Sequence, residues 1–255
     1  MKIRQHIPNL LTCSNLVFGC FACIEALSGD YFCAMIAIFI AAVFDFADGL
    51  AARVLRAYSP IGKDLDSLAD IVSFGVAPGM MLYDFLDRTQ KTVDWNHPLT
   101  GSVFLFAALA VPIFSALRLA KFNNDDRQTT SFIGLPVPAH ALFWASLIYF
   151  LSIHSERNAI AGIFPQFISI RLPAIPSLFM LLIISVSAIG SSLLLVTKIP
   201  MFSLKFNSLA WKGNELRYVI LIAALVFILC FGSTGIALTV LLYILLSRLH
   251  LIHSK

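Results

Sequence analysis

Apolar segments long enough to form membrane helices recur along the whole chain, separated by short stretches that contain glycine, proline or charged residues. A helix crosses the hydrocarbon core of a bilayer, about 30 Å thick, with about 20 apolar residues. The pattern predicts about eight transmembrane helices, at residues 10–27, 31–55, 65–86, 103–122, 137–153, 177–196, 218–231 and 235–249. One helix over 218–249 would be about 48 Å long, so we expect a tight hairpin at Gly232 and Ser233.

The composition favours an all-α, polytopic membrane helix bundle over a soluble domain. Of the 255 residues, 59% are hydrophobic and 13% are charged, and the mean hydropathy is +0.87. We expect the first apolar segment to remain as a span, because no polar flank with a small-residue cleavage site follows it. No internal repeat or low-complexity tract divides the chain, so we expect a single integral membrane domain over residues 1–255.

The basic residues are distributed unevenly between the two sides that eight spans would define. Of the 18 Lys and Arg residues, 14 lie on the side that holds both termini, and the other four are Arg88, Lys91, Arg157 and Arg171. Because cytoplasmic loops carry the excess of basic residues, both termini are expected in the cytoplasm. The net charge of +4 then reflects orientation and attraction to anionic membrane lipid, and no nucleic-acid partner is expected.

Four aspartates stand close together at one predicted cytoplasmic turn, and charges inside membrane segments are costly and mark functional sites. The chain reads D-F-A-D-G-L-A-A-R over residues 45–53 and G-K-D-L-D-S-L-A-D over residues 62–70. Residues three, four, seven and eight apart share one face of a helix. One stripe of the second span therefore carries Asp45, Asp48, Gly49, Ala52 and Arg53, and one stripe of the third carries Gly62, Asp66 and Asp70.

The four carboxylates converge if these two spans are antiparallel neighbours joined by a short turn at residues 58–61. They would repel one another strongly unless cations lie between them. Mg²⁺ and Mn²⁺ prefer carboxylate oxygen and commonly bind phosphate at the same time, so the residues point to a phosphorylated substrate. The alternative is that the aspartates pair with Arg53, Arg56 and Lys63, or face a water-filled vestibule.

This array resembles the signature of the CDP-alcohol phosphotransferases, D-x-x-D-G-x-x-A-R followed after a gap by G-x-x-x-D-x-x-x-D. Every fixed position of the signature is filled. Beyond it, residues 65–78, 118–123 and 132–139 resemble the branch of that family whose acceptor is L-serine. The resemblance covers roughly residues 5–150 and implies a catalytic core over about 5–197, with an additional helical hairpin over about 216–250.

The resemblance also implies roles for individual residues. Two divalent ions, Mg²⁺ or Mn²⁺, would be bound by Asp45, Asp48, Asp66 and Asp70, and Asp70 would also be the general base. The CDP moiety would contact Asn9, Thr12, Asp48, Gly49, Ala52, Arg53, Ser59 and Gly62. Ser67 and Ser73 lie close to the acids in sequence and could line the acceptor pocket, and the family pattern adds Arg118.

The expected reaction transfers the phosphatidyl group of CDP-diacylglycerol to L-serine, with CMP as the leaving group and no covalent lipid–enzyme intermediate. The expected location is the cell membrane, with the active site on the cytoplasmic side, and the family resemblance implies a homodimer. Two alternatives stay open. The acceptor could be glycerol 3-phosphate or inositol phosphate, whose own phosphate would need additional basic residues. The chain could also be a cation-coupled transporter whose aspartates line a pathway.

Overall fold

The computed structural model describes residues 6–57, 59–92, 98–124, 132–155, 177–197, 199–201, 211 and 214–253. In these residues the chain is helical apart from two strands of two residues each, which confirms the all-α class. The elements are α1 (His6–Ser28), α2 (Tyr31–Leu55), α3 (Pro60–Asp70), the π-helical segment η2 (Ile71–Val76), α4 (Ala77–Lys91), α5 (Pro98–Asn123), β1 (Phe132–Ile133), α6 (Val137–Ser155), α7 (Ser177–Val196), β2 (Pro200–Met201), α8 (Glu215–Phe231) and α9 (Thr234–His253).

Five helical segments are long and apolar enough to cross a membrane, so the chain is a polytopic membrane protein. They are His6–Ser28, Tyr31–Leu55, Ile61–Lys91, Phe104–Asn123 and Leu178–Val196. The third extends beyond the predicted 65–86, because α3, η2 and α4 follow one another without a break. All eight predicted segments are helical, but α6, α8 and α9 contain shorter apolar stretches than a full span requires.

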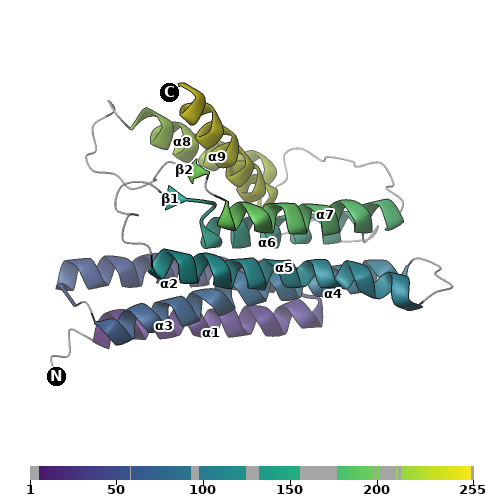
Figure 1. Cartoon of the computed structure of the whole chain (residues 1–255), viewed down its shortest axis with the longest axis horizontal. Helices are drawn as coiled ribbons and strands as arrows, with labels where there is room; N and C mark the ends of the chain where they lie inside the picture. Colours follow the sequence, from purple (N-terminus) through teal and green to yellow (C-terminus); the bar gives the residue numbers. More distant parts are fainter. Residues whose placement is uncertain are drawn as a thin grey trace.

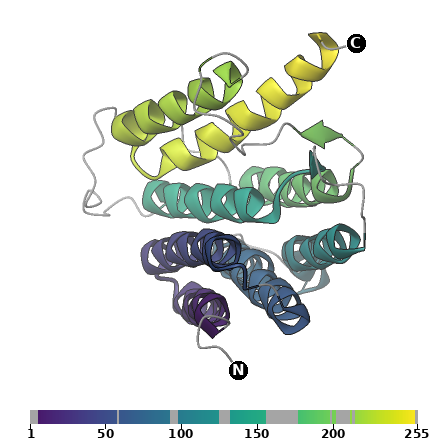
Figure 2. The same cartoon turned by 90° about the vertical axis from the view of Figure 1, so that its left-hand side faces the viewer.

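The N-terminal helices form one half of the molecule and the C-terminal helices the other (Figure 1). In the first half α1 packs against α2, α3, η2 and α4, and α5 packs against α4 and η2. Helices α6 and α7 form the next layer, through contacts with α2, α4 and α5. The hairpin of α8 and α9 lies on the side opposite to α1 and contacts the rest through α9 (Figure 2). Its turn is at Gly232 and Ser233, as the sequence predicts.

The connection between α2 and α3 positions the acidic ends of both helices. Helix α2 ends at Leu55 and is capped by Arg56, which adopts a left-handed conformation (φ 49°) and donates its backbone N–H to carbonyl oxygens of the last turn. Helix α3 begins with Ser59 as N-cap, whose Oγ accepts a hydrogen bond from the Gly62 N–H at 3.0 Å, and with Pro60 in the first turn. Tyr58, within the predicted turn, lies outside the described residues.

The π-helical segment η2 begins directly after Asp70. Pro78 follows in the first turn of α4, and proline cannot donate the backbone hydrogen bond that a regular α-helix needs. A wider turn before the proline relieves this mismatch, and such turns occur frequently at functional sites. The segment buries Ser73, Phe74 and Gly75 against α1 and α5.

Candidate metal and nucleotide site

Three carboxylates from two helices meet near the connection between α2 and α3. Asp45 and Asp48 of α2 and Asp66 of α3 each offer an oxygen, and these oxygens lie within 4.8 Å of one another. Asp48 is buried, whereas Asp45 and Asp66 are half-buried. The structure thus brings together three of the four predicted acids, from the two neighbouring helices that the sequence pattern required.

Asp70 is not part of this group of three. It lies one helical turn beyond Asp66 at the end of α3 and is buried. Its Oδ1 accepts a hydrogen bond from Asn15 Nδ2 of α1 at 3.2 Å. The fourth acid is therefore held at greater depth, on the side of the cluster where the π-helical segment begins.

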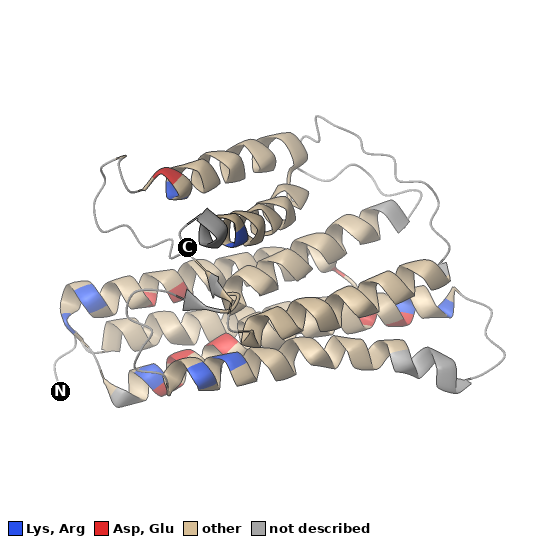
Figure 3. Ribbon diagram, turned by 45° about the horizontal axis from the view of Figure 1, so that its top comes forward, with Lys and Arg blue, Asp and Glu red and all other residues tan. Residues whose placement is uncertain are grey.

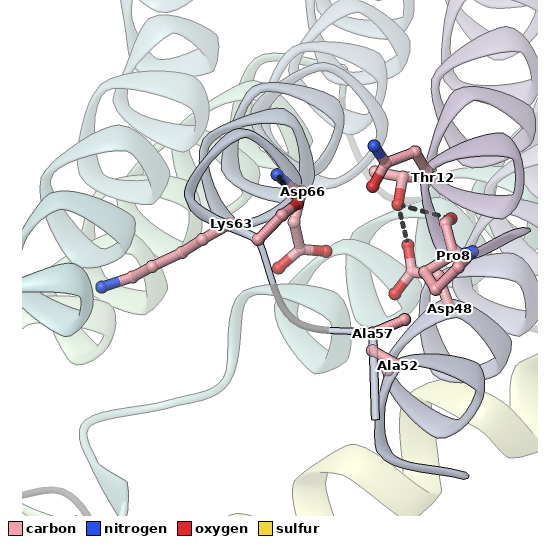
Figure 4. A pocket seen from close by; sticks show the side chains of 11 residues that line it. Pro8, Thr12, Asp48, Ala52, Ala57, Lys63 and Asp66 are labelled. Atoms are coloured by element: carbon pink, nitrogen blue, oxygen red, sulfur yellow. Dashed lines mark hydrogen bonds between the residues drawn. The ribbon is translucent and has the colours of Figure 1, made fainter. Parts of the chain in front are cut away.

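Helix α1 also contacts the cluster through Thr12. Its Oγ1 lies 2.6 Å from Asp48 Oδ2 and 3.0 Å from the Pro8 carbonyl oxygen, one turn earlier on the same helix (Figure 4). The hydroxyl has a single proton, so it can donate to only one of these oxygens at a time. Thr12, expected to contact the donor phosphates, thus also orients a carboxylate of the cluster.

None of the salt bridges among the described residues includes any of the four aspartates. They join Arg88 to Asp84 and Lys91 to Asp87, both within α4. Across the part of the chain that the structure describes, neither Arg53, Arg56 nor Lys63 forms a salt bridge with the cluster. Among the described residues, the alternative in which the acids pair with these cations finds no support.

The donor set fits a divalent cation. Carboxylate oxygens are the preferred ligands of hard ions such as Mg²⁺ and Mn²⁺, and three negative charges this close together are stabilised by a cation between them. The cluster of Asp45, Asp48 and Asp66 could hold such an ion, and the geometry does not distinguish one hard divalent ion from another.

A pocket of about 200 Å³ opens beside the carboxylates, between the start of α1, the end of α2 and the start of α3. It is lined by Pro8, Asn9, Thr12, Asp48, Gly49, Ala52, Ala57, Ser59, Gly62, Lys63 and Asp66. In Figure 4 the carboxylate groups of Asp48 and Asp66 face the space between their helices. Every residue expected at the CDP moiety lines this pocket except Arg53.

Arg53 is not among the residues that line the pocket, and its contact with the CDP moiety stays a prediction. The side chain is exposed, and its Nε donates a hydrogen bond to the Gly49 carbonyl oxygen at 2.9 Å. The reason is local, because a residue at i+4 can reach back along its own helix to satisfy a carbonyl oxygen near the helix end. Lys63 is the cation among the lining residues, although its Nζ points away from Asp66 and donates to the Asn123 carbonyl oxygen at 3.1 Å (Figure 4).

The three candidate acceptor residues have different surroundings. Ser67 Oγ accepts a hydrogen bond from Asn123 Nδ2 at 2.7 Å and so joins α3 to α5. Ser73 is fully buried and donates to the Asn15 carbonyl oxygen at 3.1 Å, which makes it a packing contact between η2 and α1. Arg118 of α5 is buried as well, and its guanidinium lies 5.3 Å from the centre of the Phe122 ring.

Asn15 is a polar residue beside the acids that sequence reasoning did not single out. It is a fully buried amide in the first half of α1, three residues after Thr12. That spacing places both polar residues on the face of α1 that contacts the acids. A search for polar residues at helical spacing within the first apolar segment would have found it.

Comparisons with a family model and with individual known proteins point to the same family. The sequence model of the family described as CDP-alcohol phosphatidyltransferase matches residues 5–171. A Bacillus subtilis protein named CDP-diacylglycerol–serine O-phosphatidyltransferase is 38% identical over 134 residues, which are 52% of this chain and 70% of that protein. A Methanocaldococcus jannaschii protein of the same name is 32% identical over 170 residues, which are 66% of this chain and 75% of that protein. The match to a Helicobacter pylori protein of that name, 34% identical, spans 54% of that protein.

Proposed function

Because this chain belongs to the CDP-alcohol phosphatidyltransferase family, we propose that it transfers the phosphatidyl group of CDP-diacylglycerol to L-serine, forming phosphatidylserine and releasing CMP. The observation that carries the proposal is the cluster of Asp45, Asp48 and Asp66 beside a pocket lined by the signature residues. The names of the relatives support serine as the acceptor.

In the proposed mechanism the serine hydroxyl oxygen attacks the phosphorus atom attached to diacylglycerol. The bond from that phosphorus to CMP breaks, CMP leaves with the electron pair, and the hydroxyl proton passes to the Asp70 carboxylate. Asp45, Asp48, Asp66 and Asp70 would hold two divalent ions, Mg²⁺ or Mn²⁺, which neutralise charge on the diphosphate when bound. Asp70 is suited to the role of base because it is buried beyond the three-carboxylate group.

The donor's CDP moiety is proposed to occupy the pocket between α1, α2 and α3. Gly49 and Ala52 leave room on the α2 side, and Asn9, Ser59 and Gly62 form the opposite wall. A Cβ atom at Gly62 would lie 3.0 Å from Ser59 Oγ and 3.1 Å from Asn9 Oδ1, so this wall is tightly packed. Arg53 lies at the exposed rim, where its Nε donates to the Gly49 carbonyl oxygen and its two Nη groups could contact the donor.

Arg118 is the proposed binding residue for the serine carboxylate. Its guanidinium is buried, and its Nε has no hydrogen-bond partner among the described residues. Ser115, one turn earlier on α5, packs on Gly75 of η2, whereas Asn123 contacts Ser67 of α3. Arg118 therefore lies at the level of the α3–η2 junction, where Asp70 is located.

The orientation of the protein in the membrane is part of the proposal. The charged residues gather at the ends of the helices (Figure 3). The end that holds the pocket exposes Arg53, Arg56, Lys63 and Lys121, and we propose that it faces the cytoplasm. The predicted orientation also counted basic residues that lie outside the described part of the chain. These are Lys2, Arg4, Arg127, Arg157, Arg171, Lys198, Lys205, Lys212 and Lys255. The homodimer and the division into a core over 5–197 and a hairpin over 216–250 stay predictions.

The proposal is tested by CMP release from the purified protein in detergent with CDP-diacylglycerol and Mn²⁺ or Mg²⁺. L-serine, glycerol 3-phosphate and inositol phosphate are compared as acceptors, and EDTA is the control. We expect rapid release with serine alone and none in EDTA. Release with a different acceptor would keep the family and change the substrate. Absence of release with every acceptor would contradict the enzyme proposal and favour a transporter.

A bulky side chain at Gly49 is expected to block the donor site without unfolding the protein. A Cβ atom at Gly49 would have no neighbour within 4 Å, and the residue lines the pocket. Gly49→Leu should therefore raise KM for CDP-diacylglycerol at least about 10-fold, which corresponds to about 1.4 kcal/mol. Gly190→Leu is the matched control, because Gly190 on α7 is equally open and lies away from the pocket. Equal KM values for the two variants would argue against a donor in this pocket.

A further inference from the structure

Asn15 is an amide buried where apolar packing would be expected. The residue is 0% exposed and lies in the middle of α1, a helix of 23 residues with mostly apolar neighbours. Its Nδ2 donates to Asp70 Oδ1 at 3.2 Å. Its own Oδ1 accepts no hydrogen bond from any residue that the structure describes. Burying an amide with an unsatisfied oxygen costs about 1–3 kcal/mol, so Asn15 is a poor choice for stability alone.

A second contact holds α1 and the segment after Asp70 together. Ser73 of η2 donates from its Oγ to the backbone carbonyl oxygen of Asn15 at 3.1 Å. The approach depends on Gly19, one turn later on α1, where a Cβ atom would lie 2.9 Å from Ser73 Cα. The contact of α1 with η2 is thus close and hydrogen-bonded, directly beside the bond from Asn15 to Asp70.

The two contacts restrict how the Asp70 carboxylate can turn. Asp70 ends α3, and η2 begins at the next residue, so its backbone lies where the helical repeat changes. The amide group of Asn15 occupies Oδ1 from the α1 side. Oδ2 has no such partner from α1 and is the oxygen that we assign to the acceptor hydroxyl.

We propose that Asn15 is a positioning residue for Asp70. The Asn15 amide holds Asp70 Oδ1 by a hydrogen bond, so that Asp70 Oδ2 is presented to the acceptor hydroxyl. The inference rests on the proposed function, because it assumes that Asp70 is the base. Asn15 acts through Asp70 and does not itself contact the reacting atoms. Its contribution is to the rate of the transfer step and not to the binding of either substrate.

The test compares Asn15→Ala and Asn15→Leu with the unchanged protein in the CMP-release assay with serine. We expect kcat to fall about 10-fold to 100-fold in both variants, the range found for groups that orient an active-site residue. KM for serine and for CDP-diacylglycerol should stay within about threefold. Both variants should remain folded at the assay temperature, because the loss of one hydrogen bond to Asp70 is offset in part by removal of the unsatisfied amide oxygen, and the midpoint of thermal unfolding in detergent checks this.

Ser192→Ala is the control for loss of a buried polar group. Ser192 is fully buried on α7, and its Oγ also has no hydrogen-bond partner among the described residues. If either Asn15 variant keeps full kcat, or if kcat falls only in proportion to the folded fraction, the positioning role is wrong. Should Asn15→Leu not fold, Asn15→Ala decides alone.

The two proposals can fail separately. Asp70→Asn with full activity would remove the base assignment, whatever the Asn15 variants do. An inactive Asp70→Asn together with fully active Asn15 variants would leave the proposed function intact and overturn the positioning role.

Discussion

Asp70→Asn is expected to lower serine-dependent CMP release at least about 10³-fold in a protein that still folds. An amide has nearly the shape of a carboxylate, and its oxygen can still accept the hydrogen bond from Asn15 Nδ2, so α1 and α3 should remain packed. The amide cannot take the proton of the serine hydroxyl, and loss of a general base typically costs 10²-fold to 10⁴-fold. Loss of a metal-binding oxygen would add to this effect.

The measurement is CMP release at saturating serine, with the elution profile in detergent as the check on folding. Asp64→Asn is the matched control, because Asp64 is an exposed aspartate on the same helix and occupies a variable position of the signature. We expect Asp64→Asn to have the activity of the unchanged protein. If Asp70→Asn retained more than about a tenth of the activity, a different residue would have to be the base.

Divalent metal is expected to raise the midpoint of thermal unfolding, and Asp66→Asn should remove most of that response. With an effective dielectric constant of about 20, two unit charges 4.8 Å apart repel by about 3.5 kcal/mol, and Asp45, Asp48 and Asp66 lie within this distance. A cation at 100 times its dissociation constant stabilises the folded state by about 2.7 kcal/mol. For a chain of this size we expect a rise of about 5–10 °C with Mn²⁺.

Asp66→Asn should also be more thermostable than the unchanged protein in EDTA, since it removes one of three mutually repelling charges. The same variant should lose nearly all CMP release. Thermal unfolding in EDTA and in Mn²⁺, each with Asp64→Asn as the control, measures both effects. A variant that is less stable in EDTA and still responds fully to Mn²⁺ would show that Asp66 is a structural residue.

Much of the fold could be predicted because it depends on interactions close in sequence. The apolar runs predicted a helix at each of eight segments, and the glycine and serine at 232 and 233 marked the hairpin turn. The length of the third span was underestimated, because the helical segment extends beyond the apolar run at both ends, where Lys63, Asp64 and residues 87–91 interrupt the apolar pattern. Polarity at a helix end is a weak signal for where the backbone stops being helical.

The site could be predicted to the level of helix faces. Asp45, Asp48 and Asp66 come together because helical spacing and a short connection leave them few other arrangements. The position of Arg53 could not be predicted in the same way, since a flexible side chain chooses between the pocket and its own helix backbone. Its hydrogen bond to Gly49 is decided by rotamer and solvent exposure, which a sequence pattern does not contain.

The sequence by itself determined the membrane class, the helical segments and the faces that carry the acids, because these follow from composition and periodicity along one chain. The family signature was recognised by resemblance, residue by residue. Only the tertiary structure decided which acids share a cluster and which residues of α1 contact them. The hydrogen bonds from Thr12 to Asp48 and from Asn15 to Asp70 join residues 36 and 55 positions apart. Gly19 allows α1 to approach Ser73 closely beside the bond from Asn15 to Asp70, and that distance of approach is set by how the helices pack.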